Sequence, residues 1–142
     1  MAELESNLAT PLAGWVNGAW YKLPMLFGYS DIVYQNWGTN NLPVGDSNYD
    51  SSAVPSGQIW IITNLAMGYT GTVPANITMR INRSGVYPLI FRQTSPVNNV
   101  WYDRQGWWVL KSGDKLNVDV SGATSSNALW AQAIGFAVDI AL

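Results

Sequence analysis

The chain has 142 residues, enough for one domain with a buried core, and it contains neither cysteine nor histidine. These absences exclude a disulfide framework, a thiolate metal site and the commonest general base of enzymes. Charged residues make up 11% of the sequence and hydrophobic residues 48%, with 8 Trp and 7 Tyr. Since soluble domains average about 25% charged residues, we expect copies of the chain or a partner to cover part of its surface. The alternative is a surface made polar by Asn, Ser, Thr and Gln, in which the chain is rich.

The first segment, residues 1–30, is apolar but has the period of neither a helix nor a strand. Leu4 and Leu8 permit one short helical turn, which Pro11 ends. Glycines and prolines then interrupt a run of aromatic and aliphatic side chains. Since disorder normally accompanies low hydrophobicity, we expect an extended arm whose aromatic side chains pack against the domain or against a neighbour.

Residues 38–57 are predicted to be the longest loop, because Gly, Asn, Asp, Ser and Pro dominate them. A connection of this length is either functional or a plain surface loop. Asp46, Asn48 and Asp50 could supply oxygen ligands to calcium, but they lack the spacing of an EF-hand. Asx turns are therefore the interpretation that we favour for these side chains, and we expect no metal site.

From Gly57 onward the patterns are those of β-strands. Residues 76–83 place Ile77, Met79 and Ile81 on one face, and residues 115–120 alternate in the same way. The strands that we expect are 58–64, 76–83, 86–92, 107–111, 115–120 and 129–142, the last of them one strand or two broken near Gly135. Pro88 makes the third an edge or bulged strand. With no helix expected after residue 12, residues 31–142 are predicted to form an antiparallel sandwich or barrel.

Reactive groups are scarce. Without histidine there is no ordinary Ser-His-Asp triad. The candidate carboxylates for a glycosidase pair are Asp46, Asp50, Asp103, Asp114 and Asp119. Asp114 follows Gly113 in a turn, where Asp usually bonds backbone groups, and Asp119 lies on the polar face of a strand. We therefore expect no enzymatic activity and no cofactor.

Signals for other partners and compartments are also missing. No run of Lys or Arg marks a nucleic-acid surface, and no apolar span of about 18 residues marks a membrane helix. The first residues lack the basic segment and apolar core of a signal peptide, so we expect synthesis in the cytoplasm.

The aromatic residues are the most informative feature. Trp107 and Trp108 are adjacent on a predicted strand, so their side chains point to opposite faces. One fills the core, and the other packs under a loop, binds a ligand or lies in a subunit interface, where tryptophan is enriched. The candidate outward aromatic surface consists of Trp101, Tyr102 and Trp107.

Four segments carry a resemblance to a known family: VPSGQIWIIT at 54–63, WWVLKSGDKLNV at 107–118, SGATS at 121–125 and GFAVDI at 135–140. They resemble small β-sandwich proteins of tailed-phage virions, and more loosely the trimeric jelly rolls of the tumour necrosis factor type. The resemblance implies an all-β, antiparallel jelly-roll-like β-sandwich with an extended N-terminal arm.

In such phage families, members of this size are often capsid decoration (cement) proteins that sit as trimers on the head and clamp neighbouring major capsid subunits. The resemblance thus implies a homotrimer on the capsid surface of the virion. The arm residues expected to contact the capsid or a subunit are Trp15, Trp20, Tyr21, Leu23, Met25, Leu26 and Phe27.

Two other functions remain open. One is a carbohydrate- or receptor-binding module of a phage tail, with Trp101, Tyr102 or Trp107 as a platform that Asn98, Asn99 and Asp103 flank. The other is a structural subunit of a tail or baseplate, which would share the fold and the composition.

Overall fold

The computed structural model describes residues 13–16, 19–22, 31–71, 76–124 and 127–140. Within the predicted arm, β1 (Ala13–Val16) and β2 (Ala19–Lys22) form an antiparallel hairpin that places Trp15 opposite Trp20. Tyr21 is opposite Gly14 in the same hairpin. Leu23, Met25, Leu26 and Phe27 lie outside the described residues.

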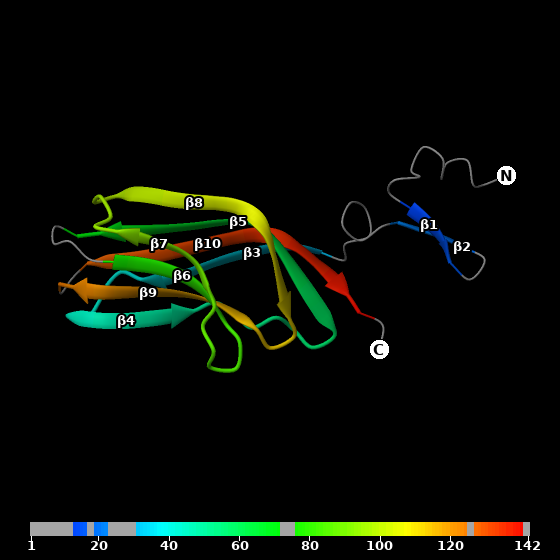
Figure 1. The fold of residues 1–142 in the computed structure, drawn as a ribbon, viewed down its shortest axis with the longest axis horizontal. Helices are drawn as coiled ribbons and strands as arrows, with labels where there is room; N and C mark the ends of the chain where they lie inside the picture. Colours follow the sequence, from blue (N-terminus) through cyan, green and yellow to red (C-terminus); the bar gives the residue numbers. More distant parts are fainter. Residues whose placement is uncertain (1–12, 17–18, 23–30, 72–75, 125–126, 141–142) are drawn as a thin grey trace.

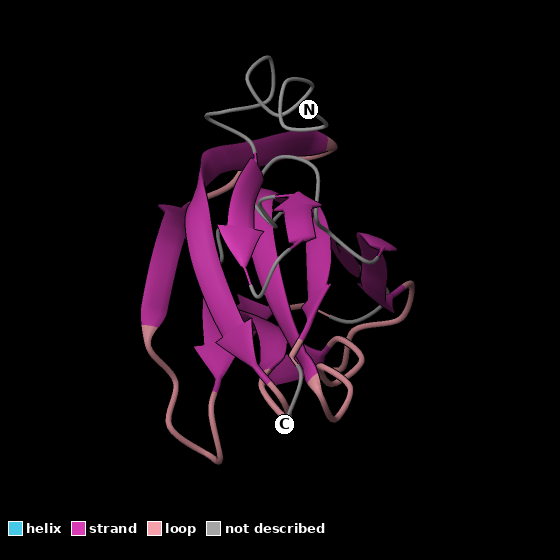
Figure 2. Ribbon diagram, turned by 90° about the vertical axis from the view of Figure 1, so that its right-hand side faces the viewer, coloured by secondary structure: helices cyan, strands magenta, loops and turns pink. Residues whose placement is uncertain are grey.

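Eight further strands form two four-stranded antiparallel sheets (Figure 1). The strands are β3 (Asp31–Thr39), β4 (Gly45–Asp50), β5 (Gln58–Thr70), β6 (Asn76–Asn82), β7 (Leu89–Thr94), β8 (Val100–Lys111), β9 (Lys115–Ala123) and β10 (Ala128–Asp139). Sheet I has the order β3-β10-β5-β8 and sheet II the order β4-β9-β6-β7. This is the strand order of an eight-stranded jelly roll, so the predicted fold class is confirmed. Figure 2 shows the strands of the sandwich from the side.

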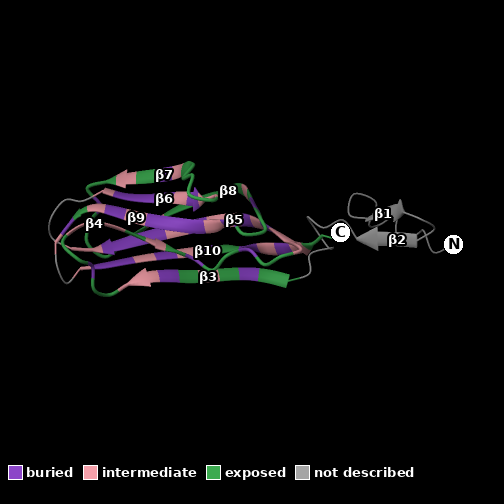
Figure 3. Ribbon diagram, turned by 90° about the horizontal axis from the view of Figure 1, so that it is seen from below, coloured by how far each residue is buried: buried purple, intermediate pink, exposed green. Residues whose placement is uncertain are grey.

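The core lies between the two sheets (Figure 3). The alternation predicted for β6 is confirmed, because Ile77 and Met79 are fully buried and Ile81 nearly so. Sheet I contributes residues such as Leu65 and Met67 from β5 to the same cluster. Each sheet therefore has one face in the core and one face outside, and the outside faces are where a partner can bind.

The prediction of one loop over residues 38–57 is wrong, because β4 forms in the middle of this segment. Its turn-like composition conceals an alternation in which Tyr49 packs against the core while Asp46 and Asp50 are exposed. Pairing with β9 supplies the backbone hydrogen bonds that composition alone did not indicate. The indole Nε1–H of Trp37 on β3 also donates to the carbonyl of Tyr49 at 3.1 Å and so joins the two sheets.

The edge position predicted for the strand near Pro88 is confirmed, but its bounds are not. The strand predicted at 86–92 begins only at Leu89, after Pro88, and among the described strands β7 pairs with β6 alone. The irregularity predicted near Gly135 is also confirmed. β10 is one strand whose register shifts between Ile134 and Gly135. A Cβ at Gly135 would lie 2.1 Å from the carbonyl oxygen of Ile61, so the two backbones approach too closely there for any side chain. The part of the chain that the structure describes contains no helix long and apolar enough to cross a membrane.

Candidate functional site

The outer face of sheet II is polar, and its side chains bond to one another. The Nδ2 of Asn117 donates to Asp50 at 2.7 Å and to Asn48 at 3.2 Å. Asp50 also accepts from Asn82 at 3.0 Å and pairs with Lys115 at 3.6 Å. Arg80 and Asp119 form a further ion pair on this face, and Arg92 donates to Thr78. Most of these groups bond to one another, but the Nε of Arg80 and the Oδ1 of Asn117 are buried without a hydrogen-bond partner among the described residues.

The residues considered as a calcium loop belong to this network. The carboxylate of Asp46 accepts from the backbone N–H of Gly122 on β9 at 2.9 Å, which differs from the Asx turn that we expected. Asp50 is held by Asn82, Asn117 and Lys115. In the described ranges there is no group of three or more His, Cys, Asp or Glu side chains that could hold a metal ion.

The outer face of sheet I is apolar over one half of its length. One row crosses all four strands, because Ile32 on β3 pairs with Phe136 on β10, Phe136 with Ile61 on β5, and Ile61 with Val109 on β8. We call this region the apolar patch, which consists of Ile32, Tyr34, Ile61, Trp107, Val109, Ile134 and Phe136. Five of its members are exposed: Ile32 by 65%, Trp107 by 59%, Tyr34 by 57%, Val109 by 51% and Ile134 by 45%. Such a contiguous apolar surface marks an interaction site.

The two adjacent tryptophans lie as predicted. Trp107 points outward and packs edge-on against Phe136, with ring centroids 6.1 Å apart and an angle of 79° between the ring planes. Trp108 is half-buried and packs against the core cluster. The contact with Phe136 leaves much of the Trp107 ring exposed, so the patch presents a fixed aromatic surface to solvent.

The predicted outward set of Trp101, Tyr102 and Trp107 is not one surface. Tyr102 packs against the core, and its hydroxyl accepts a hydrogen bond from the backbone N–H of Val97 at 2.8 Å. Trp101 is 47% exposed. It lies on the outer face of sheet I, but Asp103 and Gln105 separate it from Trp107 along β8. The structure therefore groups Trp107 with the apolar patch and leaves Trp101 at the other end of the sheet.

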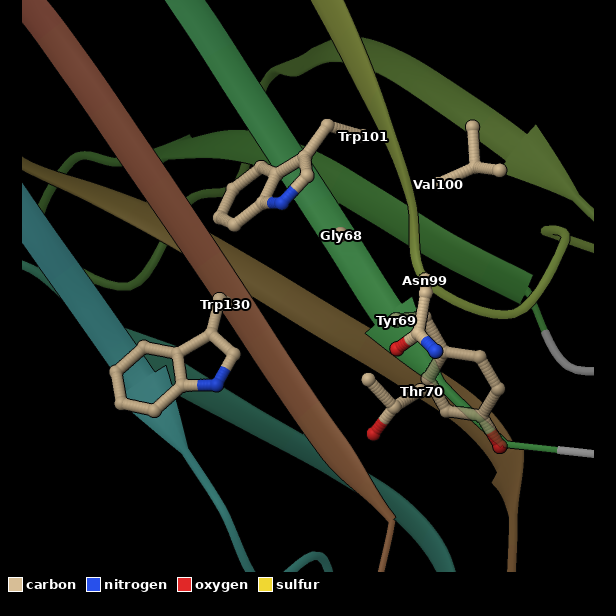
Figure 4. A pocket seen from close by; sticks show the side chains of 7 residues that line it. All are labelled: Gly68, Tyr69, Thr70, Asn99, Val100, Trp101 and Trp130. Carbon is tan, nitrogen blue, oxygen red and sulfur yellow. The ribbon is translucent and has the colours of Figure 1, made fainter.

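At that other end, Trp101 and Trp130 flank Gly68 (Figure 4). Gly68 on β5 pairs with Trp101 on β8 and with Trp130 on β10. The cleft between them has a volume of about 130 Å³, and we call it the tryptophan cleft. Its described lining residues are Gly68, Tyr69, Thr70, Asn99, Val100, Trp101 and Trp130. Sequence analysis missed Trp130, because only the strand order brings it within reach of Trp101.

An ion pair between the partly exposed Arg83 and the buried Asp114 holds the turn between β8 and β9. Arg83 donates to the Asp114 carboxylate through Nη2 at 2.7 Å and Nε at 3.0 Å, and the backbone N–H of Lys111 donates to it at 2.9 Å. The bond from Lys111 confirms the backbone role predicted for Asp114. Burial opposes ionisation of this carboxyl, but the hydrogen bonds and charges of Arg83 and Lys111 outweigh burial and hold the pKa of Asp114 below its usual range. Asp114 is 5% exposed, and its bonds indicate a structural role.

No protein-family model matches the sequence, and no curated protein matches it. Among solved structures, a chain of the acidic stable capsid of Helicobacter pylori bacteriophage KHP30 superposes with a TM-score of 0.54 at 9% identity, over 80% of this chain and 96% of that chain. A chain of Bacillus endospore appendages aligns with a TM-score of 0.39 at 16% identity, over 85% of this chain and 100% of that one. A chain of infectious bursal disease virus aligns with a TM-score of 0.34 at 9% identity, over 89% and 37% respectively. The last two scores are too low to support a conclusion, and the first shows that this chain shares its fold with a chain of a bacteriophage capsid.

Proposed function

We propose that the chain is a non-enzymatic structural protein of a phage virion, and specifically a capsid decoration protein. Its role is to stabilise the head by bridging major capsid subunits as a homotrimer. The shared fold supports this proposal. The alignment covers 96% of a chain from a phage capsid, and the capsid chain therefore consists of little besides this fold.

The observation that carries the proposal is the contrast between the two outer faces. Sheet II is covered with mutually bonded polar groups, whereas the apolar patch on sheet I crosses four strands. Fully burying a Leu- or Ile-sized side chain contributes about 1.5–3 kcal/mol. The five most exposed patch residues are 45–65% exposed, so each has about 1 kcal/mol still to contribute. We assign the patch to the contact between copies within the trimer, because a contiguous exposed apolar surface marks a protein–protein contact.

The N-terminal arm is the second contact in this proposal. Its aromatic and aliphatic residues, Trp15, Trp20, Tyr21, Leu23, Met25, Leu26 and Phe27, bind the neighbouring major capsid protein. A trimer that carries three arms binds an assembled lattice more tightly than one arm does, because each later contact is tethered. Binding only the assembled lattice then stabilises that lattice by mass action.

Labelling intact particles with an antibody raised against the purified chain tests this function. The proposal predicts regular labelling of the head. Labelling confined to the tail or baseplate would overturn the decoration role and support the tail alternatives. Absence of label from particles whose other proteins are all detected would overturn a virion role altogether.

A further inference from the structure

The tryptophan cleft is a second feature of sheet I, separate from the apolar patch. Gly68 makes room for the Trp101 ring, because a Cβ at this position would lie only 3.0–3.4 Å from three atoms of that ring. The ring of Trp101 therefore lies over the glycine. Trp130 is two strands away from Trp101, which places the two backbones roughly 10 Å apart.

Both indoles of the cleft are held in place in the free protein. Trp101 is seated on Gly68, and the indole Nε1–H of Trp130 donates to the Oδ1 of Asn40 at 3.1 Å. Binding therefore needs little ordering of either ring, which favours affinity. Figure 4 shows the Trp101 indole reaching across β5 toward the Trp130 indole on β10, with Thr70 and Asn99 farther along the cleft.

The chemistry of the lining selects a neutral ligand. None of the seven described lining residues carries a charge. Thr70 accepts a hydrogen bond from the N–H of Ala128 at 2.9 Å and keeps its own hydroxyl proton to donate. The carboxamide of Asn99 makes no hydrogen bond among the described residues, so it can both donate and accept. Two aromatic faces beside uncharged hydrogen-bonding groups match a ring that has one apolar face and a polar rim.

We propose that the tryptophan cleft binds a single neutral hexopyranose residue of a carbohydrate. The C–H bonds on one face of the sugar carry partial positive charge and stack on the negative faces of the indoles, while its hydroxyl groups bond to Thr70 and Asn99. The cleft, of about 130 Å³, is smaller than the pockets of about 300–1,000 Å³ that drug-sized ligands occupy, so its ligand is small, and we take it to be a single sugar residue. The site differs from the predicted aromatic platform, because it uses Trp130 and excludes Tyr102 and Trp107.

Saturation-transfer NMR on the full chain tests the proposal, with methyl β-D-glucopyranoside, methyl β-D-galactopyranoside and N-acetyl-D-glucosamine as probes. At least one sugar should receive saturation, mainly at the C–H protons of one face. Trp101→Ala and Trp130→Ala should each weaken binding about tenfold or more, since both remove a stacking face. Gly68→Ala should weaken it too, because the added methyl group displaces the Trp101 ring while both indoles remain.

Leu89→Ala is the control. It removes an exposed apolar side chain from β7 of sheet II, outside both the cleft and the apolar patch, so sugar binding should not change. Thermal melting followed by circular dichroism checks that each variant is folded. The proposal is overturned if no sugar receives saturation, if folded Trp101→Ala binds as tightly as the parent, or if Leu89→Ala loses binding equally.

Discussion

Ile134→Asp places a charge in the middle of the apolar patch. Ile134 lies on β10 opposite Tyr34 on one side and Asn64 on the other, and it is 45% exposed. The backbone carbonyl of Ile134 accepts a hydrogen bond from the Thr63 hydroxyl at 3.3 Å, and the substitution preserves that atom. The side chain therefore contributes little inside one copy and much at a contact between copies.

The substitution is expected to have a small effect on the stability of the free chain and a large effect on the association of copies. The free energy of unfolding should fall by at most about 1 kcal/mol, the range of strand propensities at an exposed position. When copies of Ile134→Asp associate, the contact lacks about 1 kcal/mol of apolar burial that Ile134 supplies in the parent. The contact also removes an unpaired carboxylate from water, which costs several kcal/mol. A total of about 4 kcal/mol per contact weakens association roughly a thousandfold.

Light scattering at several concentrations measures the effect, with circular dichroism melting as the check on folding. The parent chain should be a trimer and Ile134→Asp a folded monomer. Leu89→Asp is the matched control, because Leu89 is 60% exposed on β7 of sheet II, and its variant should remain trimeric. If folded Ile134→Asp assembles like the parent, or if Leu89→Asp dissociates equally, the assignment of the patch is refuted.

Three other variants test separate parts of the account. Gly135→Ala should destabilise the fold by more than about 2 kcal/mol, because its Cβ would meet the Ile61 carbonyl, and an unchanged melting temperature would contradict this. Asp114→Asn should cost about 2 kcal/mol at pH 7 in urea unfolding. Because the folded pKa of Asp114 is lowered, its stabilisation is full above the unfolded value near 4 and is lost as pH falls through the folded value. A difference from the parent that does not shrink as the pH falls below about 4 would contradict this ion pair. Deletion of residues 1–28 should leave a folded domain that no longer binds particles, and tight binding by the truncated chain would disprove the role of the arm.

Strands with strong local patterns could be predicted from the sequence. The alternation in β6 and β9 marks buried and exposed faces directly, Pro88 excludes a central strand, and Gly135 marks the irregularity in β10. β4 could not be predicted, because its residues are typical of turns and its strand conformation depends on pairing with β9.

Prediction of the outer surfaces would have required the order of the strands in each sheet as well as their positions in the sequence. Ile32 and Val109 belong to one row only because β10 and β5 lie between their strands. Trp130 and Trp101 become neighbours of Gly68 for the same reason. No local pattern contains this information, since the pairs are far apart in the sequence. The opposite orientations of Trp107 and Trp108 were predictable, because that inference requires only the two-residue period of a strand.

The central claim is that the chain stabilises an assembled head, and heat challenge of particles that lack the chain tests it most directly. The particles are produced by phage whose coding sequence for the chain is deleted. They are heated with and without added purified protein, and the release of their DNA is followed by dye fluorescence. The account predicts that the parent chain raises the release temperature to a saturating value, while Ile134→Asp and the chain without residues 1–28 do so weakly or not at all. An unchanged release temperature at saturating concentrations of the parent chain would contradict the account.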